Sequence, residues 1–282
     1  MKIYYTSECL SYNQPGHPES PERIHTIHNL LMQKDFHFTN PDPCTKEDIL
    51  RTHSPDHLEC VKNGTFFDMD TPAYPGIYAI ALLSAGSAIQ TAESAITDGH
   101  AFSLMRPPGH HATKNRVMGF CYFNNIAIAT AKYLVNNSNH KVAILDIDCH
   151  HGNGTEDIFT NNPSVLYISL HQSPLYPGTG LNSTDNCINY PLPPGTDEVQ
   201  YLETLDSACE KIKKFNPGLI GISAGFDTFS GDPISNFGLH VESYFKIAKK
   251  IKEFKKPTFH IMEGGYSTDL PQCVYEYLRG LN

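Results

Sequence analysis

Six short apolar runs recur along the chain, separated by stretches with helical periodicity. The runs cover residues 2–5, 101–105, 142–148, 165–170, 219–223 and 258–262. Most are nearly continuous in apolar residues, as strands are when both faces of a parallel sheet are covered. Strands that alternate with helices form βαβ units. The sequence therefore predicts an α/β fold with a central, mostly parallel β-sheet flanked by helices.

Four of the intervening stretches have the pattern expected of helices. Residues 78–96 and 125–134 are helix-like segments. Two further stripes of apolar residues at helical spacing lie in residues 199–212 and 241–251. Strand and helix patterns alternate along the whole chain, with no internal repeat, low-complexity tract or obvious linker. We therefore expect a single domain over residues 1–282.

Composition narrows the class of protein. The chain has 282 residues and a net charge of −9, which disfavours a nucleic-acid-binding surface. No apolar stretch reaches the length of about 18 residues that a transmembrane helix needs, so we expect no membrane span. The eight cysteines have no CxxC spacing and no signal peptide opens the chain, which indicates free thiols in a reducing, cytoplasmic compartment. A lysine cluster in residues 249–256 is expected to be the solvated face of a helix.

Polar residues follow the predicted strands where each one ends. These segments are residues 106–111, 146–150, 169–171, 224–227 and 263–266. Open parallel sheets bind their ligands beyond the carboxyl ends of the strands. Repeated His, Asp and Tyr at those ends predict a ligand-binding or catalytic site.

One strand end has the spacing of a metal site. Asp146, Asp148 and His150 alternate in sequence, so their side chains share a side if the strand continues. Asp148, His150 and Asp227 together offer two carboxylates and one imidazole, and three protein ligands leave a position open for water. A metal ion there would polarise a carbonyl and lower the pKa of the bound water.

Candidate acid–base groups accompany this site. His110 and His111 could act as general base or acid toward that water, and Asp146 could orient one of the imidazoles. Tyr266 follows a Gly-Gly turn and could face a developing oxyanion. Taken alone, each piece is more simply a turn, a helix cap or an incidental histidine pair. Their joint placement after successive strands favours hydrolysis of an amide or ester.

Several motifs, in order along nearly the whole chain, carry a family resemblance. They lie at residues 16–23, 106–112, 119–125, 146–154, 225–227 and 263–266. This set resembles the signature of the zinc-dependent histone deacetylase family, which also includes acetylpolyamine amidohydrolases and acetoin utilisation proteins. The resemblance implies an arginase-like three-layer fold and a deacetylase or deacylase activity.

The resemblance also implies two kinds of metal ion. It places one catalytic Zn²⁺ on Asp148, His150 and Asp227, with Tyr266 binding the substrate carbonyl opposite the metal. The family also carries structural K⁺. Its inner site matches five residues, partly through backbone carbonyls: Asp146, Asp148, His150, Ser169 and Leu170.

The tandem histidines have different expected roles in the family. His111 is the expected general base and acid, beside His110. Asn153 stands where some members have aspartate, and this resembles the class II branch. An aspartate would hold an imidazolium more firmly than a neutral amide does, so the pKa of the base should differ between branches.

Substrate contacts are implied in the same way. Phe120 and Tyr176 would be the walls of an acyl-lysine tunnel, with Gly119 beside Phe120. The family more often has phenylalanine at the second wall, so the tyrosine is a candidate for altered acyl preference. Asp70 matches, in a looser alignment, an aspartate that holds the substrate backbone. Polyamine-selective members tend to have glutamate where this chain has Ile234, which weakens the polyamine interpretation.

The leading prediction is hydrolysis of ε-N-acyl-lysine in proteins or peptides. Deacetylation of a small acylated amine, such as an acetylpolyamine, is the alternative within the same chemistry. An arginase-like dimanganese hydrolase would need a second set of bridging ligands, which the motifs lack. An inactive acyl-lysine binding module would typically have lost a metal ligand or the tyrosine, whereas this chain retains all of them. Neither the oligomeric state nor the acyl preference follows from the sequence.

Overall fold

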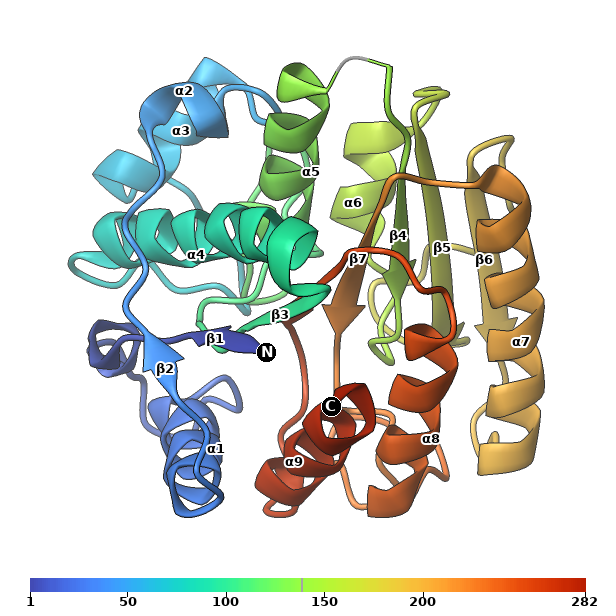
Figure 1. Ribbon diagram of the computed structural model, residues 1–282. Helices are drawn as coiled ribbons and strands as arrows, with labels where there is room; N and C mark the ends of the chain where they lie inside the picture. Colours follow the sequence, from blue (N-terminus) through green and yellow to red (C-terminus); the bar gives the residue numbers. More distant parts are fainter. Residues whose placement is uncertain (138) are drawn as a thin grey trace.

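The computed structural model describes residues 1–137 and 139–282, and its centre is one β-sheet (Figure 1). Eight strands lie in the order β2-β1-β3-β8-β7-β4-β5-β6. Every neighbouring pair is parallel, so the predicted α/β fold is confirmed and the sheet is parallel throughout. The strands are β1 (Lys2–Tyr4), β2 (Phe38–Thr39), β3 (His100–Ser103), β4 (Val142–Asp146), β5 (Val165–Gln172), β6 (Cys187–Leu192), β7 (Leu219–Ala224) and β8 (Thr258–Met262).

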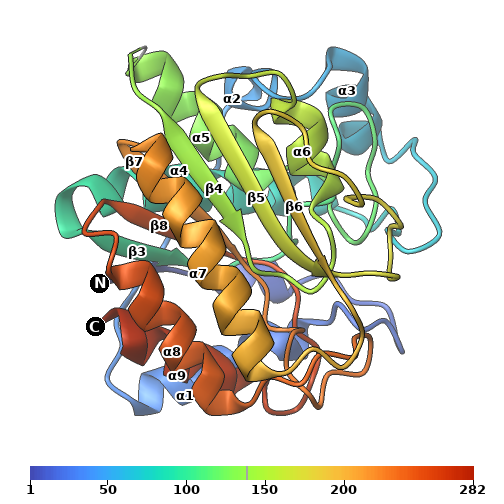
Figure 2. The ribbon, with the colours of Figure 1, turned by 90° about the vertical axis from the view of Figure 1, so that its right-hand side faces the viewer.

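Helices cover both faces of the sheet and give the molecule three layers (Figures 1 and 2). α4, α5 and α6 pack on one face, with α2 and α3 outside them, and α1, α7, α8 and α9 cover the other face. The helices are η1 (Ser7–Leu10), α1 (Pro21–Gln33), α2 (Lys46–Ile49), α3 (Pro55–Asn63), α4 (Ile77–Asp98), α5 (Asn125–Asn136), α6 (Asn153–Phe159), α7 (Glu198–Phe215), α8 (Val241–Lys252) and α9 (Leu270–Leu281).

The four predicted helices are present as α4, α5, α7 and α8, with one correction to the packing of α7. Its cap is as expected, because the Asp197 side chain accepts a hydrogen bond from the backbone N–H of Gln200. The buried stripe, however, begins at Tyr201 and continues through Leu205. Val199, expected in that stripe, is 62% exposed, because the face that meets the sheet is rotated toward Tyr201.

The central strands provide the core. Every residue of β4, β5, β7 and β8 is buried, which explains their nearly unbroken apolar sequences. Each fully buried Ile, Leu or Val side chain contributes roughly 1.5–3 kcal/mol to stability. This rigid sheet fixes where the loops at its carboxyl edge begin.

Other expectations from composition can be compared with the structure. All eight cysteines are free, as predicted, and seven of them are buried. Among the described residues, no helix combines the length and the apolar character needed to cross a bilayer.

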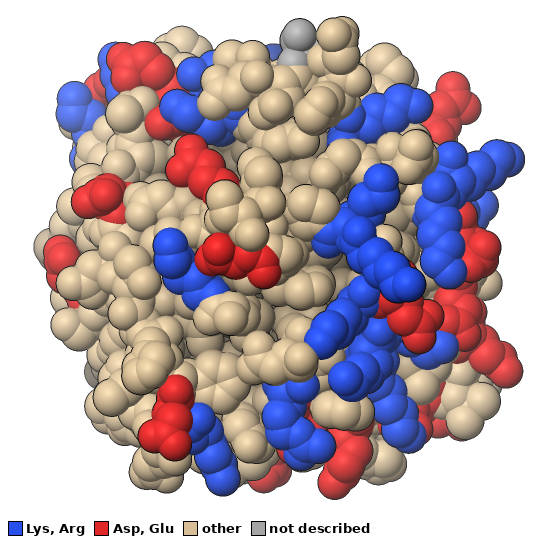
Figure 3. All heavy atoms as spheres, in the orientation of Figure 1, with Lys and Arg blue, Asp and Glu red and all other residues tan. Residues whose placement is uncertain are grey.

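Lysines gather on one face of the molecule, over α7 and α8 (Figure 3). Several are paired across the two helices. Lys246 contacts Glu198 at 2.5 Å and Lys250 contacts Asp206 at 2.5 Å. The cluster is thus a solvated surface on which ion pairs connect the two helices. Such exposed pairs contribute little to stability.

Candidate active site

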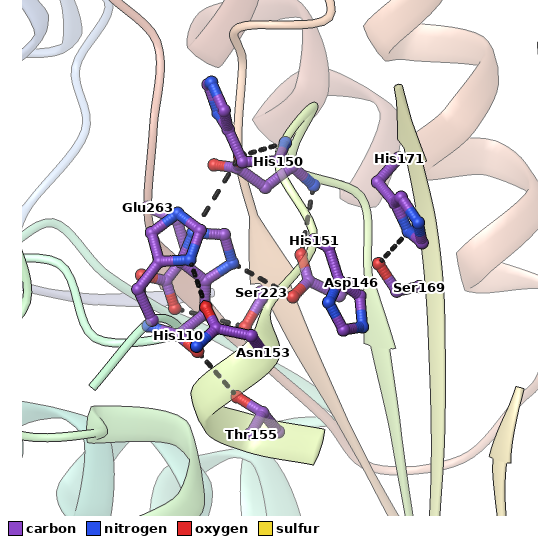
Figure 4. Close-up of polar contacts among 12 residues, drawn as sticks. His110, Asp146, His150, His151, Asn153, Thr155, Ser169, His171, Ser223 and Glu263 are labelled. Carbon is purple, nitrogen blue, oxygen red and sulfur yellow. Dashed lines mark hydrogen bonds and ion pairs between the residues drawn. The ribbon is translucent and has the colours of Figure 1, made fainter. Parts of the chain in front are cut away.

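The loops that follow the central strands enclose a pocket of about 320 Å³ at the carboxyl edge of the sheet. Nine residues predicted for the site line it together: Asp70, His110, His111, Gly119, Phe120, Asp148, His150, Tyr176 and Tyr266. Five further residues complete the lining: Pro18, Pro108, Leu175, Ile234 and Gly264. Figure 4 shows the polar contacts behind this lining, where Asp146 and Asn153 meet the histidines.

Asp148, His150 and Asp227 form a compact donor group. One ligand atom from each lies within 4.8 Å of the other two, and all three residues are buried. Nδ1 of His150 is 3.1 Å from Oδ1 of Asp148 and 2.9 Å from Oδ2 of Asp227. The second oxygen of each carboxylate accepts a backbone N–H, from Gly264 at 2.8 Å and from Cys149 at 2.7 Å. Each carboxylate therefore keeps one oxygen directed at the imidazole nitrogen.

The charges of this group favour a cation. Burial and the neighbouring Asp148 carboxylate raise the pKa of Asp227 to about 7. Two carboxylates held side by side without solvent repel each other unless a positive charge lies between them. Two oxygens and one imidazole nitrogen are also a donor set that binds Zn²⁺ in proteins, with a coordination position left for another ligand. The residues present thus fit a divalent metal ion.

His110 is held by a carboxylate. Its Nδ1 lies 3.0 Å from Oδ2 of Asp146, which also accepts the hydroxyl hydrogen of Tyr167 at 3.0 Å. Burial alone would lower the pKa of His110, but the charges of Asp146 and Asp148 raise it to about 10. These carboxylates therefore favour the protonated form of His110.

His111 has the opposite environment. Its Nδ1 lies 2.8 Å from Oδ1 of Asn153. Burial and the neighbouring His110 and His150 hold the pKa of His111 well below its usual range. An amide oxygen only accepts hydrogen bonds, so Nδ1 of His111 carries the hydrogen and Nε2 is left with a free lone pair. The two adjacent histidines thus have opposite electrostatic environments, and the lone pair on Nε2 makes His111 the better candidate for a proton acceptor.

Tyr266 reaches the pocket from the loop between β8 and α9. Its ring packs edge-on against Phe120, with centroids 5.9 Å apart, and the guanidinium of Arg23 lies 4.5 Å from the ring centre. Its backbone N–H donates to Oδ2 of Asp232 at 2.7 Å. Burial raises the pKa of the Tyr266 phenol well above its usual range. The phenol therefore remains a hydrogen-bond donor across the physiological pH range.

Phe120 and Tyr176 both line the pocket, and their settings differ. Tyr176 packs edge-on against His111, with centroids 5.2 Å apart, and is 38% exposed. Phe120 packs edge-on against two rings, those of His17 at 4.8 Å and Tyr266 at 5.9 Å between centroids. Gly119 has φ +56°, and a Cβ there would collide with the His111 ring. Only glycine permits this approach of the backbone to the imidazole.

Asp70 and Ile234 both belong to the lining of the pocket. The carbonyl of Asp70 accepts a hydrogen bond from Nε2 of His17 at 3.1 Å. The backbone N–H of Ile234 donates to Oδ1 of Asp232 at 3.1 Å. Asp232 thus joins the segment that bears Ile234 to the loop that bears Tyr266, a role that no short motif indicated.

The residues expected at the potassium site are buried around the carboxyl ends of β4 and β5. Asp146 and Ser169 are Cα partners in the register of these strands. The Ser169 hydroxyl contacts Nδ1 of His171 at 2.9 Å. Their role in binding K⁺ stays a prediction.

A buried ionic network supports the site, and the sequence did not reveal it. The fully buried Arg106 contacts both carboxylate oxygens of Glu19, at 2.8 and 2.7 Å. Arg23 contacts Glu19 at 3.1 Å and donates to the carbonyls of Glu263 and Gly265, each at 2.6 Å. All three residues of the network lie inside the motifs that carry the family resemblance. Membership of a motif was therefore the signal that could have indicated their importance.

Glu263 provides a further support that was missed. One oxygen of its buried carboxylate accepts the backbone N–H of Gly109 at 2.7 Å, and the other accepts the Ser223 hydroxyl at 3.1 Å. The carboxylate therefore connects the histidine loop to the ends of β7 and β8.

Comparison with known proteins identifies the family. Residues 17–281 match the histone deacetylase domain. The chain belongs to the histone deacetylase family. A probable deacetylase of Archaeoglobus fulgidus, also similar to this chain, is 36% identical over 95% of this chain and 81% of that protein.

Two further relatives of this histone deacetylase family member have names that state a substrate. Acetylpolyamine amidohydrolase 1 of Pseudomonas aeruginosa is 39% identical over 72% of this chain and 62% of that protein. The crystal structure of an acetylpolyamine aminohydrolase from Burkholderia pseudomallei has a TM-score of 0.90 and 26% identity, and covers 99% of this chain and 98% of that chain. These likenesses support a hydrolase of the deacetylase type with the arginase/deacetylase fold, and they imply acylated substrates.

Proposed function

We propose that the protein is a zinc-dependent deacylase that hydrolyses the amide bond of ε-N-acyl-lysine in proteins or peptides. One observation carries the proposal: Asp148 and His150, two members of the donor group that Asp227 completes, line the same pocket as His111 and Tyr266. A metal site, a base and an oxyanion donor around one cavity are the parts that amide hydrolysis requires.

The three donor residues would hold the zinc ion, which when bound polarises the amide carbonyl and acidifies water. His111 accepts the proton of the attacking water at Nε2, because its Nδ1 is committed to Asn153. The hydroxyl of Tyr266 donates a hydrogen bond to the oxyanion of the tetrahedral intermediate. His111 then returns the proton to the departing amine nitrogen, so the lysine leaves as a neutral amine.

His110 acts differently from His111 in this scheme. Its imidazolium is stabilised by Asp146 and stays protonated through the cycle. The positive charge lies beside His111, with ring centroids 4.0 Å apart, and disfavours a second permanent charge there. His110 thus keeps His111 available as a base.

The rest of the pocket supports an acyl-lysine substrate. Phe120 and Tyr176 form the walls for the aliphatic part of the lysine side chain, beside Gly119. Asp70 would hold the substrate backbone at the mouth. Ile234 offers no charge to a cationic amine inside the tunnel, which favours lysine over a polyamine.

Three further parts of the proposal concern the protein's surroundings. A structural K⁺ would bind around Asp146 and Ser169, which are Cα partners in the register of β4 and β5. The protein would act in the cytoplasm, where its eight free cysteines stay reduced. Its partners would be acylated proteins or peptides rather than nucleic acid.

Hydrolysis of an acetylpolyamine is the second candidate function. It is favoured by the likeness to proteins named acetylpolyamine amidohydrolases. The same metal site, base and tyrosine would perform that reaction.

The test is turnover of the zinc-loaded protein on acyl-lysine peptides and acetylated polyamines measured side by side, with a hydroxamate-inhibited control. We expect hydroxamate-sensitive cleavage with higher kcat/KM for the peptides. Cleavage of polyamines alone would contradict the lysine assignment and keep the hydrolytic chemistry.

A further inference from the structure

A short segment at the mouth of the pocket, residues 66–71, is held in place at several points. We call it the rim segment. The ring of Phe66 packs edge-on against Tyr122 at 5.7 Å. The hydroxyl of Thr71 accepts the backbone N–H of Phe120 at 2.9 Å, and His17 binds the carbonyl of Asp70 at 3.1 Å. These contacts tie the segment to the lining of the catalytic pocket.

The rim segment presents two large apolar side chains to water. Phe67 is 92% exposed and Met69 is 87% exposed, whereas the next large apolar side chain among the described residues, Val199, is 62% exposed. Neither Phe67 nor Met69 contributes to the pocket lining. Anchoring the backbone while leaving such side chains uncovered is unfavourable in water, and contiguous exposed apolar surface marks interaction sites.

The alternate residues of the segment face the other way. Phe66 and Asp68 are half-buried, so exposure alternates along residues 66–69 as it does in an extended chain. The charges of Asp68 and Asp70 act with burial to raise the pKa of the Tyr176 phenol, which lines the same mouth. The mouth therefore combines two carboxylates near Tyr176 with the exposed apolar side chains of Phe67 and Met69.

We infer that the rim segment is the docking surface for the polypeptide that flanks the acylated lysine, with Phe67 and Met69 contacting an apolar side chain and Asp68 a basic one. This inference rests on the proposed function and extends it from the reacting group to the substrate's neighbouring residues. A small acylated amine that fills the pocket has no apolar group that reaches outside it. A peptide flank does, and two acidic groups at the mouth complement a basic residue.

The experiment compares the Phe67→Ser/Met69→Ser double variant with the unaltered protein on three substrates. They are an acetyl-lysine peptide with leucine and arginine flanks, Nε-acetyl-lysine methylamide, and N-acetylputrescine. We expect kcat/KM for the peptide to fall about tenfold through KM, the effect of losing exposed apolar contacts. Values for the two small substrates should stay within about twofold, because both bind inside the pocket.

Two controls make the result specific. Val135→Ser removes a 59% exposed apolar side chain from the last turn of α5, far along the helix from the Asn125 end. It should leave kcat/KM unchanged for all three substrates. Asp68→Asn should lower kcat/KM for the arginine-flanked peptide more than for the same peptide with glutamate in place of arginine.

The outcomes separate the inference from the function on which it rests. Unchanged peptide turnover in the double variant, or an equal fall on all three substrates, would overturn the docking surface while leaving the deacylase. Unaltered protein that cleaves no acyl-lysine substrate would overturn the proposed function, and the docking surface with it.

Discussion

At the scale of single residues, identical side chains have different properties because their neighbours differ. His110 and His111 are adjacent in sequence, yet a carboxylate holds one and an amide holds the other. The first has a raised pKa and the second a lowered one. This separation supports the proposal that His111 is the base.

Tyr266→Phe is expected to lower kcat about 10²–10³-fold, the usual effect of removing one oxyanion donor. The ring would keep its packing against Phe120, since only the hydroxyl is lost. Zinc content, measured by mass spectrometry, should equal that of the unaltered protein. Near-full activity in this variant would contradict the role given to Tyr266.

Asp148→Ala is expected to abolish metal binding as well as turnover. The substitution removes one of three donors and leaves His150 with a single carboxylate partner. Zinc per chain after dialysis should fall from one to near zero, while circular dichroism reports whether the fold persists. A folded variant that keeps one zinc would place the metal elsewhere.

At the scale of elements, the proposed role of Tyr266 requires that the loop between β8 and α9 be held in a fixed position. Asp232 accepts the backbone N–H of Tyr266 on one oxygen and that of Ile234 on the other. Asparagine has only one acceptor oxygen, so it cannot satisfy both donors. The carboxylate is thus a positioning group for the loop.

Asp232→Asn is therefore expected to lower kcat about tenfold with little change in KM, because small displacements of a catalytic group are costly. Asp269→Asn is the matched control, since Asp269 lies in the same loop region and its side chain makes no capping hydrogen bond. Its kcat should be unchanged. Equal kcat values for the two variants would contradict the positioning role of Asp232.

The elements also mark how far the sequence was predictive. Strands buried on both faces gave continuous apolar runs, so β1, β3, β4, β5, β7 and β8 were predicted. β6 was missed because it is an edge strand that is only partly buried and contains Pro191, which edges tolerate. β2 has two residues and is too short to give any pattern. α1 and α9 were missed although both carry buried apolar stripes and proline in the first turn.

The site was predictable where its residues lie in consecutive strand ends, and less so where distant segments meet. Arg23 lies 242 residues before Gly265, whose carbonyl it binds, so local spacing could not reveal the contact. The contacts of Asp232 could not be predicted for a similar reason, because both of its partners are backbone groups. Tertiary placement, which no motif encodes, decides these roles.

At the scale of the whole molecule, a buried ion pair joins the N-terminal segment to the active-site loops. Burial would raise the pKa of Glu19, but Arg106 and Arg23 lower it below its ordinary value of 4.5. A carboxyl with a lowered folded pKa stabilises the protein above its unfolded pKa. That contribution is lost as the pH falls through the folded value.

Glu19→Gln is expected to destabilise the fold by about 3–5 kcal/mol at pH 7, because Arg106 is left buried without its counter-charge. The difference from the unaltered protein should shrink as the pH falls below about 4.5, because Glu19 of the unfolded chain then binds a proton that the folded carboxylate, with its lowered pKa, does not yet bind. Urea unfolding at pH 7, 5 and 3.5 measures it. Glu59→Gln, which removes an exposed pair with Lys62, should cost about 0–1 kcal/mol. A gap that stays constant to pH 3.5 would contradict this account.

The central claim is that Asp148, His150 and Asp227 hold the metal ion on which hydrolysis depends. Its most direct test is deacetylation of an acetyl-lysine peptide by protein stripped with a chelator and then titrated with Zn²⁺. We predict that activity disappears on stripping and returns in full at one zinc per chain. Full activity of the metal-free protein would contradict the claim.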